Sequence, residues 1–266
     1  MLEHKKKITK EVEIQNEDLN NLDFYQHELV RVHAIDKKFV NVSFKQSIIR
    51  DCYFRNCIFR DCDFTGAGIT NSNFQGSDFV RCTFDYTTFS GTHISTIPLK
   101  RNLPSRENLK MHLAKSLRMN YASIGDYEGV TFAIDIEISA TMEHLKKATF
   151  SREAYYRGKK EFSGFGRIEH GAKYLYYKFL SFLWGNGEKP LKMFISIPIL
   201  LGLLSVIFSY SVDTPIILSI NETIHVFFIG GQSNKLGFVS SSLANIMRYI
   251  ALGLFVSSLV RRISRR

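Results

Sequence analysis

Apolar residues, all of them large except Ala34, recur at every fifth position along the first third of the chain, from Leu19 to Ile94. A helix repeats its apolar positions about every 3.6 residues and a strand every second residue, so neither element explains a spacing of five. A fixed short period instead predicts stacked coils in which each five residues form one side. The members of this series are Leu19, Phe24, Leu29, Ala34, Phe39, Phe44, Ile49, Phe54, Phe59, Phe64, Ile69, Phe74, Phe79, Phe84, Phe89 and Ile94.

Small residues form a second series, two positions before the apolar one. We expect them to fill the remaining interior, which makes the four cysteines of the chain core thiols. Successive cysteines five residues apart would lie on different sides of a coil, whereas zinc ligands must converge. We therefore expect neither a metal site nor a need for disulfides. The small series is Ser47, Cys52, Cys57, Cys62, Ala67, Ser72, Ser77, Cys82, Thr87 and Thr92.

The segments CDFTG, SNFQG and SDFVR, all between residues 62 and 81, resemble the pentapeptide-repeat family. The resemblance implies a right-handed, four-sided β-helix of about four coils, each rising by ~4.8 Å. We assign residues 19–96 to this β-helix and residues 1–18 to an N-terminal cap or tail. Some members of the family mimic DNA with an acidic surface, but residues 45–94 carry five basic and five acidic side chains. No nucleic-acid partner is expected.

Residues 97–190 are predicted to form a cytoplasmic helical connector. The segment IPLKRNLP, residues 97–104, marks the exit from the repeat. One amphipathic helix is expected after a cap at Ser105, with Leu109, Leu113 and Leu117 on one stripe, and a second after a cap at Asp126. No nucleophile, base, metal cluster or phosphate loop occurs in a catalytic arrangement, so an enzyme and a cofactor are not expected.

Two membrane spans are predicted in residues 191–266. Residues 193–212 carry no charge and are long enough to cross a hydrocarbon core of ~30 Å. A second span, residues 236–260, contains one charge, Arg248, and runs into a basic tail, residues 261–266. The loop between them, residues 213–235, contains apolar pieces, and the sequence leaves open whether it re-enters the membrane.

Basic residues flank the same ends of both spans. Lys189 and Lys192 precede the first span, whereas Arg261, Arg262, Arg265 and Arg266 follow the second. The positive-inside rule then places both termini in the cytoplasm. No apolar signal segment follows Met1, so we expect an inner (cytoplasmic) membrane location with the lipid bilayer as a partner.

The order of repeat, helical connector and two spans resembles that of bacterial pentapeptide-repeat ion channels. The resemblance is carried by FLWGNGEKPLKMF, residues 182–194, because such channels have WGxGExP sequences before their first span. It implies a homo-oligomer, most simply a tetramer. The potassium filter of that family, T-x-G-Y-G-D, has no counterpart in HVFFIGGQSNK, residues 225–235, so potassium selectivity is not expected.

Five residues are candidates for a pore or gate. Arg248 is a charge within a span, which costs at least ~2.5 to 3.5 kcal/mol and calls for a cavity or a partner. It either lines a pore, snorkels from a shorter helix, or pairs with Glu222 or Asp213. Gly253 offers a hinge or a close contact between helices. The remaining candidates are Gly230, Gly231 and Glu222.

Three functions follow from these features. The first is an oligomeric, ion-channel-like pore whose cytoplasmic repeat domain senses a protein partner or organises assembly. The second is a non-conducting membrane-anchored scaffold for protein interactions. The third is a membrane-disrupting defence effector. The sequence does not decide the permeant ion, the activating signal or the subunit number.

Overall fold

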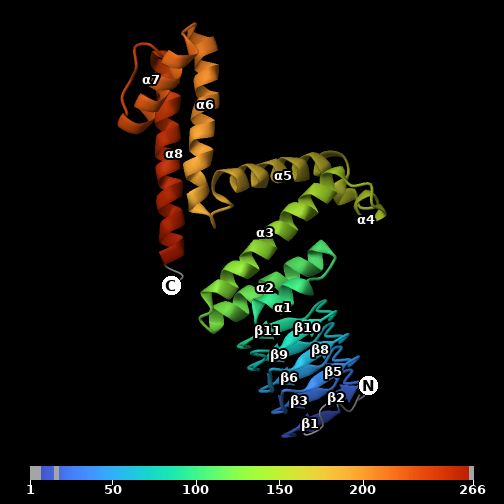
Figure 1. The fold of residues 1–266 in the computed structure, drawn as a ribbon. Helices are drawn as coiled ribbons and strands as arrows, with labels where there is room; N and C mark the ends of the chain where they lie inside the picture. The colour runs from blue at the N-terminus through green and yellow to red at the C-terminus, as the bar shows by residue number, and fades with distance from the viewer. Residues whose placement is uncertain (1–6, 15–17, 264–266) are drawn as a thin grey trace. The chain divides into compact units, whose positions relative to one another are not determined.

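A computed structural model describes residues 7–14 and 18–263 of the chain. The chain divides into two compact units, residues 1–164 and residues 165–266. The first contains the repeat and the first helices, and the second contains the long apolar helices (Figure 1). Each unit is described by itself.

The repeat region is a β-solenoid of about four turns, as predicted. Short parallel strands pair with strands twenty residues away, so that four sides complete one turn. Two sides are full ladders, β1–β3–β6–β9–β11 and β2–β5–β8–β10, and a third holds β4 and β7. Single bridges such as Asp23 to Ser43 and Ser43 to Asp63 form the fourth side. The strands are β1 (Ile8–Lys10), β2 (Asp18–Asn20), β3 (Glu28–Val30), β4 (His33–Ile35), β5 (Lys38–Val40), β6 (Ile48–Arg50), β7 (Tyr53–Arg55), β8 (Ile58–Arg60), β9 (Gly68–Thr70), β10 (Asp78–Val80) and β11 (Thr88–Ser90).

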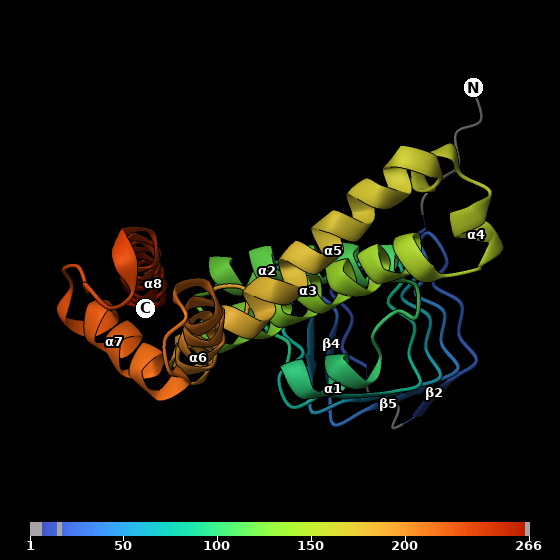
Figure 2. The ribbon, with the colours of Figure 1, turned by 90° about the horizontal axis from the view of Figure 1, so that it is seen from above.

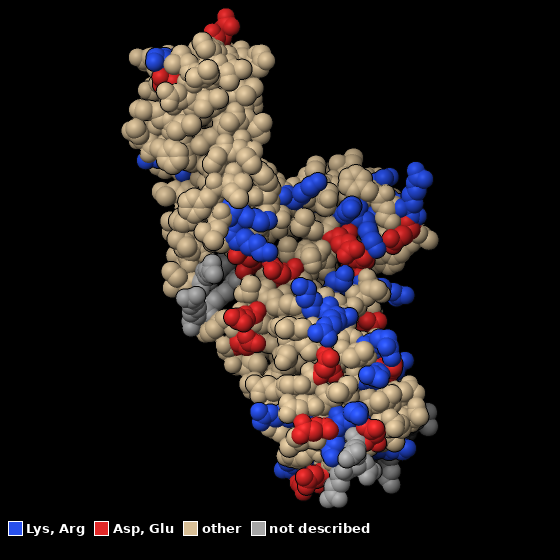
Figure 3. All heavy atoms as spheres, in the orientation of Figure 1, with Lys and Arg blue, Asp and Glu red and all other residues tan. Residues whose placement is uncertain are grey.

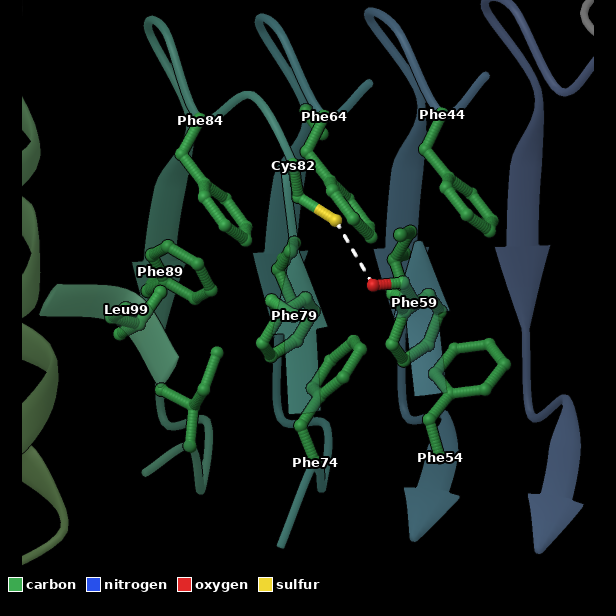
Figure 4. Packing of buried hydrophobic residues seen from close by; sticks show 14 of the residues in the cluster. Phe44, Phe54, Phe59, Phe64, Phe74, Phe79, Cys82, Phe84, Phe89 and Leu99 are labelled. Atoms are coloured by element: carbon green, nitrogen blue, oxygen red, sulfur yellow. Dashed lines mark hydrogen bonds between the residues drawn. The ribbon is translucent and has the colours of Figure 1, made fainter. Parts of the chain in front are cut away.

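The predicted interior of the solenoid is confirmed by the burial of both series. Phe59 stacks between Phe39 and Phe79, with ring centroids 4.7 and 5.1 Å apart. Phenylalanines on a neighbouring side form a parallel stack, visible in Figure 4 as Phe44, Phe64 and Phe84. Stacks of this kind add to the energy of burying the rings themselves.

The four cysteines occupy the small interior positions, as predicted, and are free thiols. The Sγ of Cys57 donates to the carbonyl oxygen of Ala34 at 3.4 Å, and the Sγ of Cys82 donates to that of Phe59 at 3.3 Å. Burial raises the pKa of the Cys57 thiol. The Cys57 thiol is therefore structural and poorly nucleophilic.

The corners of the solenoid depend on left-handed backbone. Every turn position, two residues after a member of the apolar series, has a positive φ between Asn21 and Gly91 in the part of the chain described. Asparagine, aspartate and glycine tolerate this conformation best. They fill most of these corners: Asn21, Asp36, Asn41, Asp51, Asn56, Asp61, Gly66, Asn71, Gly76 and Gly91.

The core of the solenoid continues beyond residue 96 into the helices of the first unit. These helices are α1 (Thr96–Arg101), α2 (Glu107–Ser123), α3 (Tyr127–Phe150), α4 (Ala154–Arg157) and the short 3₁₀ helix η1 (Lys160–Phe162). Leu99, Leu113 and Leu117 are fully buried with the phenylalanines in one cluster. The connector predicted to begin at residue 97 therefore shares its core with the coils.

Of the two predicted helix caps in the connector, one is formed and the other is not. Asp126 caps α3 as expected, because its Oδ1 accepts from the Gly129 N–H at 2.9 Å. Ser105 does not cap α2, whose first flanking residue is Arg106 and has no side-chain cap. The reason is that α2 begins at Glu107, one residue too late for the Ser105 hydroxyl to reach its first free N–H groups.

Two asparagines close the last coil by standing in for the backbone of a further one. Asn102 Oδ1 accepts from Cys82 N at 2.8 Å, and its Nδ2 donates to the Phe79 carbonyl at 2.8 Å. Asn120, on α2, accepts from Thr92 N at 2.7 Å and donates to the Thr92 carbonyl at 2.8 Å. An uncovered strand edge would expose such groups to pairing with other chains.

The second unit contains α5 (Gly164–Trp184), the 3₁₀ helix η2 (Pro190–Lys192), α6 (Met193–Val212), α7 (Ile216–Ile229) and α8 (Gly237–Ile263). Helix α6 coincides with the first predicted span, and α8 begins one residue after the predicted start of the second. The predicted loop, residues 213–235, contains a helix of its own, α7. Figure 1 shows α7 folding back beside α6 and α8.

Replacing Phe59 with alanine should destabilise the solenoid by about 3 to 5 kcal/mol, because it empties the middle of a stack. The rate at which the buried cysteine thiols react with a thiol reagent should then rise by about 100-fold or more, at about tenfold per 1.4 kcal/mol. The adjacent Ile58, which is 37% exposed, provides the control Ile58→Ala. Equal thiol protection in the Phe59 variant and the wild type would contradict the stacking account.

Replacing Asn120 with leucine should loosen the last coil by about 1 to 3 kcal/mol, because Thr92 N–H and C=O lose their partners in a buried site. Hydrogen exchange at residues 88–94, followed by mass spectrometry, should accelerate. The control is Met119→Leu, at an exposed neighbour on the same helix. Unchanged exchange in Asn120→Leu would show that α2 does not cap the solenoid.

Candidate functional site

Two helices of the second unit are long and apolar enough to cross a membrane. They are residues 190–212 and 237–260, with mean hydropathies of 2.3 and 1.6. Only 28% and 17% of the residues in their most apolar windows are buried in the fold. A core helix of a soluble protein would be mostly buried, so this exposure favours a lipid environment for both helices. Figure 3 shows few charged side chains on this part of the visible surface.

Helix α7 packs against both long helices. Val226 of α7, Phe208 of α6 and Ala244 of α8 form a buried cluster with Leu236. After α7, Gly230 and Gly231 reverse the chain with φ of +88° and +92°. Residues other than glycine adopt such φ values only at an energetic cost. The chain then returns to the start of α8 at Gly237.

Polar contacts hold this return segment in place. Ser233 N donates to the Ser241 hydroxyl at 3.0 Å, and Asn245 Nδ2 donates to the Gly231 carbonyl at 2.7 Å. Glu222 of α7 accepts from the Ser233 hydroxyl at 2.8 Å and pairs with Lys235 at 3.0 Å. The segment is thus tied to both α7 and α8.

Arg248 stands at the midpoint of the 24-residue candidate span in α8. Its side chain lies against Gly230, so that a methyl group added there would collide with the guanidinium. Gly230 directly follows α7, and a cation at a helix C-terminus interacts favourably with the helix dipole. The structure therefore brings together Arg248, Gly230 and Gly231, three of the five predicted site residues.

The predicted pairing of Arg248 with Glu222 or Asp213 is not formed. Glu222 is engaged by Lys235 and Ser233, and Asp213 ends α6 in the left-handed conformation. No ion pair of Arg248 occurs within residues 7–14 and 18–263. Snorkelling is also disfavoured by depth, because eleven residues at 1.5 Å each put Arg248 ~17 Å from the start of α8.

An apolar groove of about 610 Å³ lies between α6, α7 and α8, with Arg248 in its wall. Pro198 and Gly202 of α6, Phe227 of α7 and Phe255 of α8 line the rest of it. A guanidinium beside an apolar groove can attract an anion or water, or meet a carbonyl from another chain. The groove has no catalytic constellation among its lining residues.

The fifth candidate, Gly253, is not a close-packing point among the described residues. A Cβ at Gly253 would lie in open space, so the helices of one chain do not use it for close packing. Of the basic flanking residues, Lys192 donates to the Ser181 carbonyl at 3.3 Å and Lys189 lies in the turn after α5. Arg261 and Arg262 fall in the last turn of α8, whereas Arg265 and Arg266 lie outside the described residues.

The segment WGNGEKP forms a tight turn between α5 and α6. Gly185, Asn186 and Gly187 all have positive φ. The Ser258 hydroxyl of α8 donates to the Gly187 carbonyl at 3.3 Å, and the Ser196 hydroxyl of α6 donates to that of Leu183 at 2.7 Å. This turn joins the ends of three helices.

Sequence reasoning missed the polar stripe that holds the return segment. Ser241, Asn245 and Arg248 recur at i, i+4 and i+7 along α8, which places them on one helix face. Within an otherwise apolar span this spacing signals a face turned toward protein rather than lipid. Only Arg248 was recognised, because a charge is more conspicuous than serine or asparagine.

Gly230→Ala and Gly231→Ala should each cost about 1 to 2 kcal/mol, because both positions have left-handed backbone. Only the Gly230 substitution should also displace Arg248. In double variants with Arg248→Gln, the changes in the free energy of unfolding should add for Gly231→Ala and should not add for Gly230→Ala. Thermal unfolding in detergent, followed by the fluorescence of the single tryptophan, Trp184, measures this cycle. Additivity in both pairs would contradict the contact.

Comparison with known proteins supports the assignment of the repeat. Residues 36–106 match the family model described as "Pentapeptide repeat region". No curated protein matches the chain at significance.

Two solved structures resemble the chain over part of its length. QnrB1, a plasmid-mediated fluoroquinolone resistance protein, is 17% identical over 34% of this chain and 49% of its own, with a TM-score of 0.26. A pentapeptide repeat protein from the thylakoid lumen of Arabidopsis thaliana is 19% identical over 39% of this chain and 72% of its own, with a TM-score of 0.24. The match thus spans about half of QnrB1. With the strand ladders described above, the family match identifies the N-terminal region as a pentapeptide-repeat β-solenoid.

Proposed function

We propose that the protein is an oligomeric membrane pore with a cytoplasmic pentapeptide-repeat domain that organises assembly or senses a protein partner. In this proposal α6 and α8 span the inner membrane, both termini are cytoplasmic, and α7 with the return segment re-enters from the outer side. The assembly is a homo-oligomer, most simply a tetramer. The protein is not an enzyme and not a potassium-selective channel.

The observation that carries the proposal is Arg248 at the centre of α8, beside the groove and without an acidic partner in the described residues. A charge at this depth costs at least ~2.5 to 3.5 kcal/mol. Its contact with the C-terminal end of α7 returns ~0.3 to 1 kcal/mol, and at most ~2 kcal/mol. The Arg248 guanidinium also lies 5.9 Å from the centroid of the Tyr249 ring, a cation–π contact at the outer limit of distance. In our proposal water completes the solvation of Arg248, and a hydrated pore supplies that water.

The re-entrant shape of α7 supports the same function. A short helix followed by an irregular segment at membrane depth is tolerated where it is buried in protein or lines a cavity filled with water. Gly230 and Gly231 lie at its turning point, next to Arg248. A ring of arginines there disfavours cations, so the pore we propose prefers anions.

A non-conducting, membrane-anchored scaffold is the second candidate. It is favoured by the return segment, whose polar groups are satisfied within one chain by Ser241, Asn245 and Glu222. A segment closed in this way leaves few carbonyls to strip water from an ion. In the scaffold, Arg248 serves to hold α7 against α8.

Ion flux from liposomes tests the proposal. Wild type should pass anions in preference to cations, Arg248→Gln should weaken that preference, and Arg248→Glu should reverse it, because the charge facing the pore changes sign. Arg55→Gln removes the same charge from the exposed surface of the solenoid and should leave selectivity unchanged. Absence of flux in every variant, with insertion verified and triggers tried, would reject the pore and favour the scaffold.

A further inference from the structure

Helix α5 has one strongly apolar face that the fold leaves uncovered. Phe165, Ile168, Leu175 and Phe179 lie on this face at helical spacing and are 82, 69, 63 and 49% exposed. Phe182 continues the face and is 43% exposed. A soluble helix turns such a stripe toward a core, so this stripe needs a partner.

The position of α5 identifies what covers that face. Its last residues, Leu183 and Trp184, are buried against Met193, at the start of α6. Leu254 and Phe255, in the second half of α8, pack against the same cluster. The end of α5 is therefore fixed at the level where both spanning helices leave the hydrocarbon core.

The direction of α5 agrees with this position. Figure 1 shows α5 running crosswise to α6 and α8. In Figure 2, where α6 and α8 are seen along their axes, α5 extends lengthwise across the view. If α6 and α8 cross a bilayer, a helix in this direction lies along its surface.

Charge complementarity points to the same partner. Counted at 3.6 residues per turn, Arg167 and Lys178 lie on one edge of the apolar face, whereas Lys173 lies on the polar side of the helix. Lys173 is 54% exposed and pairs with Glu169 at 2.6 Å. Long basic side chains beside an apolar stripe are typical of helices that lie in the interface of an anionic membrane.

We propose that α5 is an interfacial anchor, with its apolar face in the acyl boundary of the cytoplasmic leaflet and its basic edge, Arg167 and Lys178, on anionic lipid headgroups. Trp184 then lies at the headgroup level, where indole rings are enriched. This inference rests on the membrane insertion of α6 and α8 in the proposed function. It does not depend on whether the protein conducts ions.

Fluorescence quenching in vesicles of phosphatidylcholine and phosphatidylglycerol tests the anchor. An environment-sensitive thiol probe is placed at Phe179→Cys on the apolar face, at Ser181→Cys on the polar face, or at Leu203→Cys, an exposed position in α6. The native cysteines are at most 7% exposed, and unsubstituted protein gives the labelling blank. Lipids carrying a nitroxide quench the probe from the bilayer, and iodide quenches it from water.

We expect the probes at positions 179 and 203 to be quenched by the nitroxide lipid and protected from iodide, and the probe at 181 to show the reverse. Omitting phosphatidylglycerol should reduce lipid quenching at 179 but not at 203. If the probe at 203 is quenched by lipid while the probe at 179 is quenched by iodide, the anchor is refuted. The anchor is also refuted if the probe at 179 is protected from both quenchers, because protein then covers the apolar face. If 203 escapes lipid quenching as well, the membrane insertion itself fails. Equal quenching at 179 without phosphatidylglycerol would overturn the role of anionic headgroups.

Discussion

The stability of the first unit depends on one constraint, namely that no coil of the solenoid can bury its phenylalanines by itself. Each ring needs the ring twenty residues away, as Phe59 needs Phe39 and Phe79. Nearest-neighbour stacking of this kind stabilises every coil except those at the ends. The last coil therefore requires a substitute for the missing neighbour. Leu99 supplies the apolar part and Asn102 and Asn120 supply the hydrogen bonds.

This constraint explains why the solenoid was predictable and its cap was not. The period of five appears directly in the sequence, and the buried cysteines followed from it. The corners were equally visible, because asparagine, aspartate and glycine recur there, but their role emerges only with the positive φ values. Asn120, by contrast, acts on Thr92, 28 residues away, through a packing of α2 that no local pattern reveals.

In the second unit, too, some features could be predicted from the sequence and others could not. Composition alone placed α6, since an uncharged run of that length is a strong signal. Helix α5 was not predicted individually, because Gly164 and Gly166 at its start are typical of loops and precede most of the apolar stripe. The meeting of Arg248 and Gly230 was not foreseeable, because it depends on α7 folding back against the long helices. The sequence shows the charge of Arg248, but it does not show that Gly230 lies beside it.

Polar contacts in the second unit concentrate at the two ends of its long helices. At one end the return segment is held by Ser241 and Asn245, and at the other Ser258 and Ser196 hold the turn after α5. Between these clamps the helices bury few residues, and in lipid there is no hydrophobic drive to bring them closer. The middle of the unit is accordingly a groove rather than a packed core. Arg248 lines that groove, so the residue with the greatest need for a partner borders open space on one side and Gly230 on another.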